Sequence, residues 1–176
     1  FPPNGVDAPA TNLGRLSTPQ NGEGGEIYGV ELTLSLPFEV IHPSLEGFGL
    51  IASTSFNESS IEPNGPGSGS SLPGLSDQVA NITLYYERGG FQARVSNRYR
   101  SEFLGEVSGF GNGRDFTFVE AEAVVDAQIG YDFSRGPLNG LGILFQAQNL
   151  TDQEFVTFYN GDPRQVRDFQ QYGATY

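Results

Sequence analysis

The sequence predicts an all-β fold, an antiparallel up-and-down sheet of about six to seven strands, from three observations. Six segments alternate apolar and polar residues with a period of two, which is the pattern of a strand with two different faces. The connections between these segments alternate between long and short, so a meander would place all long loops at one end. Several segments are roughly nine to eleven residues long, which matches a strand that crosses a bilayer and exceeds the usual five or six.

Composition excludes several classes of function. The 176 residues carry a net charge of −12, from 21 acidic and 9 basic residues, and this disfavours nucleic-acid binding, which needs a basic surface. The chain has no cysteine and one histidine, His42, and it lacks the G-x-S-x-G, Walker and H-E-x-x-H patterns. We therefore expect no enzyme activity, no catalytic residue, no cofactor and no metal site.

The elements of the first half follow from periodicity and from turn residues. Residues 1–25 are rich in Pro, Gly and Asn without periodicity and are predicted to form a long loop. Residues 28–36 give the cleanest alternation, and residues 48–56 give a second strand after a turn at 37–47. Residues 57–78 are dense in Gly, Pro and Ser and are predicted to be a loop.

The second half continues the meander. Strands are predicted at 80–86 and 91–100, joined by the hairpin Arg88-Gly89-Gly90, in which glycine supplies positive φ. Residues 102–117 are predicted to be a loop, 125–133 a fifth strand, 134–140 a turn and 141–148 a sixth strand. Asn149 to Asp152 ends that strand because Asn, Thr and Asp side chains capture nearby backbone groups. Residues 151–171 are predicted to be a long loop, and 172–176 the start of a seventh strand that the chain does not complete.

The polar faces of the strands carry full charges, and two architectures explain them. The charged residues are Glu31, Arg94, Arg98, Arg100, Asp126 and Asp132. In a soluble sandwich this face would meet solvent and the apolar faces would pack together. In a large barrel the charged face would line a wet or plugged lumen. The alternation pattern alone does not separate the two.

A family resemblance lies in the C-terminal third. Residues 145–152 read F-Q-A-Q-N-L-T-D, 161–166 read G-D-P-R-Q-V and 172–176 read Y-G-A-T-Y. Together these motifs resemble the C-terminal signature of TonB-dependent outer-membrane receptors, and most closely the branch associated with oligosaccharide uptake.

The resemblance implies that residues 26–176 are C-terminal strands of a transmembrane β-barrel of about 22 strands, cut before the final strand is complete, with 1–25 as an extracellular-type loop. It implies a bacterial outer-membrane protein that takes up a scarce ligand, an oligosaccharide by preference and a siderophore as the open alternative. The implied partners are outer-membrane lipid, the TonB complex acting through a plug region that is absent here, and, as in some sugar-uptake relatives, a surface lipoprotein.

The predicted ligand contacts are aromatic and arginine side chains in and beside the long loops. Flat aromatic rings stack on the apolar face of a sugar, and planar guanidinium groups hydrogen-bond its hydroxyls. The candidates are Arg98, Arg100, Phe103, Phe110, Arg114, Phe155, Tyr159 and Arg164. The alternative explanation of each aromatic residue is packing of one loop against another.

Two rival functions stay open at this point. One is a soluble, secreted β-sandwich that acts as a carbohydrate-binding module, with the loop aromatics as its site. The other is a small complete barrel with a structural or adhesive role in the outer membrane.

Overall fold

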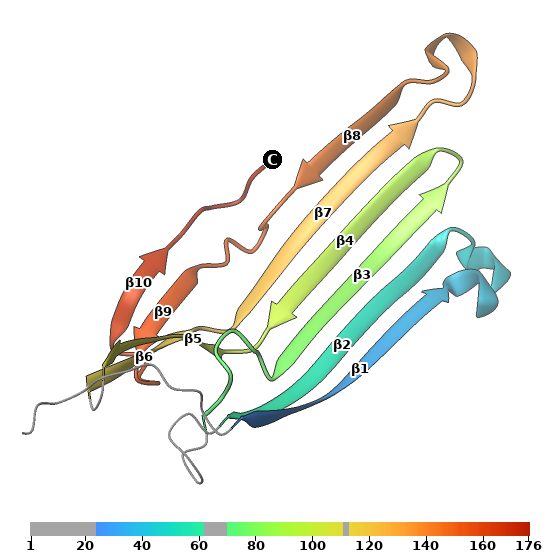
Figure 1. The fold of residues 1–176 in the computed structure, drawn as a ribbon. Helices are drawn as coiled ribbons and strands as arrows, with labels where there is room; N and C mark the ends of the chain where they lie inside the picture. Colours follow the sequence, from blue (N-terminus) through green and yellow to red (C-terminus); the bar gives the residue numbers. More distant parts are fainter. Residues whose placement is uncertain (1–23, 62–69, 111–112) are drawn as a thin grey trace, which may run out of the picture.

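The computed structural model describes residues 24–61, 70–110 and 113–176, and these form two antiparallel sheets (Figure 1). The larger sheet has six long strands in the order β1-β2-β3-β4-β7-β8. Its strands are β1 (Gly25–Pro37), β2 (Phe48–Ile61), β3 (Gln78–Arg88), β4 (Phe91–Arg100), β7 (Glu122–Asp132) and β8 (Gly142–Ala147). The predicted all-β meander and its six strands are confirmed.

The smaller sheet overturns two loop predictions. Its order is β10-β9-β6-β5, from β5 (Phe103–Phe110), β6 (Gly113–Val119), β9 (Phe155–Tyr159) and β10 (Val166–Gln170). The prediction of loops at 102–117 and 151–171 is therefore wrong. Glycines near residues 105–113 favour a loop on composition, but here Gly109 takes a positive φ of 86° in the hairpin between β5 and β6.

The register of the larger sheet sorts its side chains into the two predicted faces. Leu32 lies opposite Thr54, Leu84 opposite Val95, and Ile129 opposite Phe145 on one face. A one-residue slip would reverse every side chain, so this pairing fixes the apolar face across all six strands.

The apolar face of the larger sheet stays uncovered. Leu32 is 58 % exposed, Leu84 52 % and Val95 51 %. The buried apolar residues of the described chain, Leu104, Val119 and Phe158, belong instead to the smaller sheet. That sheet lies beyond the ends of the long strands and not over their apolar face (Figure 1). A sandwich would require the opposite, so the sandwich alternative is not the observed fold.

The short connections gather at one end of the long strands, and the smaller sheet lies at the other (Figure 1). The short end carries 3-10 helices η1 (Phe38–Val40), η2 (Pro43–Leu45) and η3 (Gly136–Leu138). The lone His42 caps η2, where its Nδ1 accepts from the Ser44 backbone N–H at 3.2 Å. Across the described ranges, no helix has the length and apolar character to cross a bilayer.

Two terminal predictions have different outcomes. The loop predicted at 1–25 falls almost entirely outside the described residues. The strand predicted to begin at Tyr172 appears only as an isolated bridge between Gln148 and Thr175, beside the end of β8. Strands β1 and β8 are the two edges of the larger sheet.

Candidate functional site

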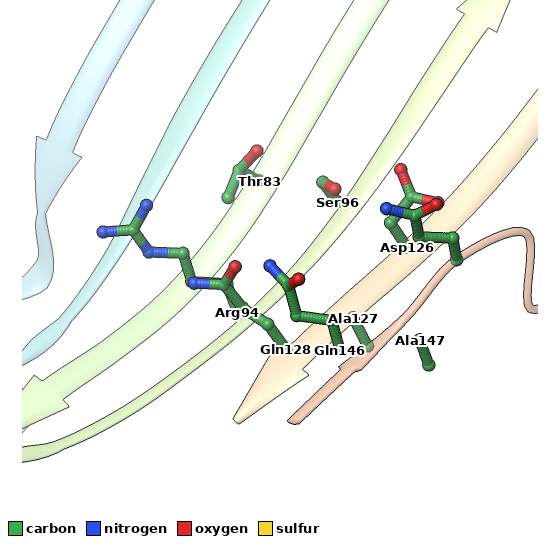
Figure 2. A pocket seen from close by; sticks show the side chains of 9 residues that line it. Thr83, Arg94, Ser96, Asp126, Ala127, Gln128, Gln146 and Ala147 are labelled. Atoms are coloured by element: carbon green, nitrogen blue, oxygen red, sulfur yellow. The ribbon is translucent and has the colours of Figure 1, made fainter. Parts of the chain in front are cut away.

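A polar depression of about 290 Å³ lies on the polar face of the larger sheet (Figure 2). Four neighbouring strands build it, because the register places Thr83 beside Ser96, Ser96 beside Asp126, and Gln128 beside Gln146. Arg94 lies opposite Gln128. The lining residues are Thr83, Arg94, Ser96, Asp126, Ala127, Gln128, Gln146, Ala147 and Gln148.

Charge in this depression is balanced between acid and base. The Arg94 guanidinium Nη2 lies 2.5 Å from Glu87 Oε1, and Arg98 Nη2 lies 3.0 Å from Asp126 Oδ2. Each arginine thus has a carboxylate partner on the same face. The remaining polar side chains are neutral amides and hydroxyls, which donate and accept hydrogen bonds without a net charge.

Asp126 joins this face to the Asn149–Asp152 turn. Its Oδ1 accepts from the Asn149 backbone N–H at 3.0 Å, while its Oδ2 holds Arg98. Asn149 has a positive φ of 54°, which Asn tolerates better than most residues. The Asn149 Oδ1 accepts from the Gln153 backbone N–H at 2.8 Å, and Nδ2 donates to the Gln153 carbonyl at 3.3 Å. The sequence motif is therefore a hydrogen-bonded turn anchored on β7.

A second depression, of about 520 Å³, continues from the first toward the smaller sheet. Asp126 and Gln148 line both depressions, so they are adjoining parts of one polar surface. The other lining residues of the second depression are Arg98, Glu122, Val124, Asn149, Gln153, Glu154, Phe155, Gln170, Tyr172, Gly173 and Thr175. It thus combines charged groups, amides and two aromatic rings, Phe155 and Tyr172.

The predicted site residues do not all come together. Arg98 and Phe155 share the second depression. Arg100 instead secures a loop, since Nε donates to Ser76 Oγ at 2.5 Å and Nη2 to the Gly74 carbonyl at 2.6 Å. The Arg100 guanidinium carbon also lies 3.6 Å from the centre of the Phe103 ring. Arg100 and Phe103 thus form a packed pair at the junction of β4 and β5.

The other predicted residues lie in the smaller sheet or its turns. Tyr159 ends β9, and its ring centre is 5.8 Å from the guanidinium carbon of Arg167. Arg114 is exposed on β6. Phe110 ends β5, and its side chain is outside the described part.

Arg164 forms an ion pair with Asp162 in the exposed turn between β9 and β10. Hydrogen bonds from the Arg164 guanidinium, then from the Arg164 backbone N–H and Gln165, lower the pKa of Asp162 from 3.8 to about 2. Among the described residues, no group of three or more His, Cys, Asp or Glu side chains is arranged to hold a metal ion.

Sequence reasoning missed the amide residues of the first depression. Gln128 and Gln146 were within reach, because both have polar-face parity and the 134–140 turn pairs their strands in a hairpin. Neither residue is aromatic or charged, so neither belongs to the predicted set of ligand contacts. The link between Asp126 and Asn149 gave no such signal, because it depends on the shape of a turn 23 residues further along the chain.

Comparison with known proteins gives one match. Residues 2–150 match the family model described as TonB dependent receptor-like, beta-barrel. No curated protein and no solved structure matches the chain significantly. The matched range covers the whole larger sheet and most of the polar depressions.

Proposed function

Because the chain belongs to the TonB-dependent-receptor-like β-barrel family, we propose that this outer-membrane receptor and transporter takes up a neutral oligosaccharide. Membership of the family places the chain in the outer membrane as part of a receptor and transporter. In such a barrel the exposed apolar face meets lipid and the polar face lines the interior. The two polar depressions then lie along the path of the ligand.

The chemistry of the first depression carries the proposal. Thr83, Ser96, Gln128 and Gln146 present hydroxyls and amides from four adjacent strands (Figure 2). Sugar hydroxyls both donate and accept hydrogen bonds, as do these side chains. Rigid strands hold the side chains in place, which lowers the entropic cost of binding.

The second depression adds aromatic surface to the same path. Phe155 and Tyr172 lie there with Arg98 and Glu122. An aromatic ring offers an apolar face to the C–H groups of a sugar ring, while the charged groups of Arg98 and Glu122 can hydrogen-bond the sugar hydroxyls. Of the other predicted contacts, Arg114, Tyr159 and Arg164 would meet the ligand only at the outer end.

Charge balance favours the oligosaccharide over an anionic iron chelate. Each of Arg94 and Arg98 already has a carboxylate at 2.5 and 3.0 Å. A site for an anionic ligand would instead present unpaired cationic groups. A siderophore remains the second candidate class, and the binding experiment includes it.

Receptors of this family work with TonB. We place its contact on a plug region outside this chain, and the contact of a surface lipoprotein at the smaller sheet, at the end of the long strands opposite the short connections.

The test is calorimetric titration of the full-length protein in detergent with a panel of neutral oligosaccharides and ferric chelates. We expect saturable binding of at least one oligosaccharide, weakened about five- to tenfold by Gln128→Ala with Gln146→Ala, since each lost hydrogen bond is worth about 0.5–1.5 kcal/mol. The matched control is Gln92→Ala, because Gln92 lies on the same polar face outside both depressions.

Tight binding of a ferric chelate with no oligosaccharide binding would replace the proposed ligand class. Oligosaccharide binding that is equally strong in the double variant and in the Gln92→Ala control would show that the ligand lies elsewhere.

A further inference from the structure

An apolar groove of about 290 Å³ lies on the opposite, lipid-facing side of the larger sheet, near the short connections. Ala93 is among its lining residues, and its side chain is smaller than those of the apolar neighbours around it. Tyr86 lies directly opposite Ala93, and Leu84 lies opposite Val95. The apolar side chains that border the groove are Phe38, Phe48, Leu84, Tyr86 and Val95.

Aromatic packing gives the groove a fixed wall. The Phe48 and Tyr86 rings are 4.4 Å apart between centroids, and the Tyr86 and Phe91 rings are 5.9 Å apart. Phe38, which begins η1 directly after β1, also lines the groove. Rings at this position suit the boundary between acyl chains and headgroups, where aromatic residues of membrane barrels are enriched.

An ion pair lies just beyond the residues that line this groove, toward the short connections. Arg88 follows Tyr86 by two residues on β3, so it shares the apolar face about 7 Å further along the strand. Its Nη2 lies 3.0 Å from Glu46 Oε2, and both side chains are more than half exposed. Gly47 keeps Glu46 close, because its carbonyl accepts from the Glu87 N–H at 2.8 Å and its φ is +91°.

Each member of this ion pair can bind one further group of opposite charge. A guanidinium has five N–H donors and a carboxylate has two oxygens, so the contact between Arg88 and Glu46 leaves donors and lone pairs on both groups. A headgroup with a phosphate and a primary ammonium carries the complementary charges, phosphate for Arg88 and ammonium for Glu46. A purely anionic headgroup would meet the Glu46 carboxylate unfavourably.

We propose that this groove, together with Arg88 and Glu46, binds one zwitterionic phospholipid with a primary amine, as in phosphatidylethanolamine. An acyl chain lies over Ala93 between Phe38 and Tyr86, and the headgroup meets the ion pair. The short turns of outer-membrane barrels face the periplasm, so the lipid belongs to the periplasmic leaflet. The occupant is a lipid because the groove is continuous with the face that already contacts the bilayer. The inference is independent of which ligand the receptor transports.

The test is native mass spectrometry of delipidated full-length protein, supplied with equal amounts of phosphatidylethanolamine and phosphatidylglycerol of identical acyl chains. We expect one retained lipid, with phosphatidylethanolamine favoured about two- to fivefold, the range that exposed ion pairs support. The double variant Arg88→Gln/Glu46→Gln should lose this preference. The control Arg135→Gln changes an exposed arginine in the neighbouring short turn and should keep it.

A second pair of variants tests the groove itself. Ala93→Leu fills the groove and should lower retention of both lipids, whereas Ala80→Leu adds the same group on the same face at the far end of β3. Gel mobility before and after heating confirms that each variant is a folded barrel. The proposal is overturned by equal retention of the two lipids, by an unchanged preference in the double variant, or by equal retention in Ala93→Leu and Ala80→Leu.

Discussion

Replacing Asp126 should destabilise the barrel more than replacing any other carboxylate on its polar face. Asp126 accepts two hydrogen bonds of 3.0 Å, from the Asn149 backbone N–H and from Arg98 Nη2. The Asp126 side chain is 25 % exposed and that of Arg98 is 61 % exposed. The backbone bond is therefore the larger contribution, and the ion pair is weakened by solvent.

The magnitude follows from these two contacts. A hydrogen bond to a charged group contributes about 1.5–3 kcal/mol, and an exposed ion pair about 0.2–1 kcal/mol. Asp126→Ala loses both, so the free energy of unfolding should fall by about 2–4 kcal/mol. Asp126→Asn retains an acceptor for the Asn149 N–H and should lose about 1 kcal/mol.

The assay is urea unfolding of the full-length protein refolded into detergent or lipid, followed by circular dichroism. The control is Asp132→Ala, because Asp132 lies on the same strand and face and accepts a long 3.4 Å bond from Gln92. That change should cost less than about 0.5 kcal/mol. If Asp126→Ala and Asp132→Ala were equally stable, or if Asp126→Asn matched Asp126→Ala, the anchoring role of Asp126 would be refuted.

Three further predictions concern the turns. The free energy of unfolding in urea should be higher for Asn149→Gly than for Asn149→Ala by about 1 kcal/mol, because glycine adopts the positive φ of this position with little strain and alanine does not. Equal unfolding midpoints would contradict this. Arg100→Gln should increase protease cleavage within residues 74–76, since it weakens the contacts that hold this loop, and unchanged cleavage would argue against a clamp. Asp162 should titrate near pH 2 by carboxyl NMR, and its pKa should rise toward 3.8 without reaching it in Arg164→Gln, because the hydrogen bonds from the backbone N–H of residue 164 and from Gln165 remain. Because its pKa is lowered on folding, the stabilisation is present above about 3.8 and disappears as the pH falls through 2; a pKa unchanged by the substitution would disprove the pairing.

The faces of the long strands could be predicted from sequence, because apolar and polar residues alternate along a strand when one of its faces is apolar and the other is polar. Leu32, Leu34 and Val95 alternate with polar neighbours, and the register joins them on one side. The match of residues 2–150 to the barrel family agrees with that part of the prediction.

The smaller sheet could not be predicted in the same way. Strand β9 reads F-V-T-F-Y, and both Thr157 and Phe158 are buried, so neither face is polar and the alternation disappears. The pairing of β9 with β6 joins segments about forty residues apart. No local signal in either segment specifies that contact.

The candidate site, too, could be predicted from the sequence only in part. The polar parity of Arg94, Gln128 and Asp126 was visible in the sequence, but their convergence depends on the strand order β4-β7-β8. Arg100 and Phe103 were predicted as ligand contacts, yet they pack against each other and the 74–76 loop. Contact of the eight predicted residues with ligand stays a prediction.

The central claim is that one face of the long strands meets lipid and the other lines the interior of the barrel. Val95 and Ser96 are neighbours on β4 with opposite orientations, and the chain has no cysteine, so Val95→Cys and Ser96→Cys each place one spin label on it. The decisive measurement is the accessibility of these labels to oxygen and to a water-soluble nickel chelate in proteoliposomes. We predict that the label at 95 is relaxed mainly by oxygen and the label at 96 mainly by the nickel chelate. Equal nickel accessibility at both positions would contradict the transmembrane assignment of the sheet.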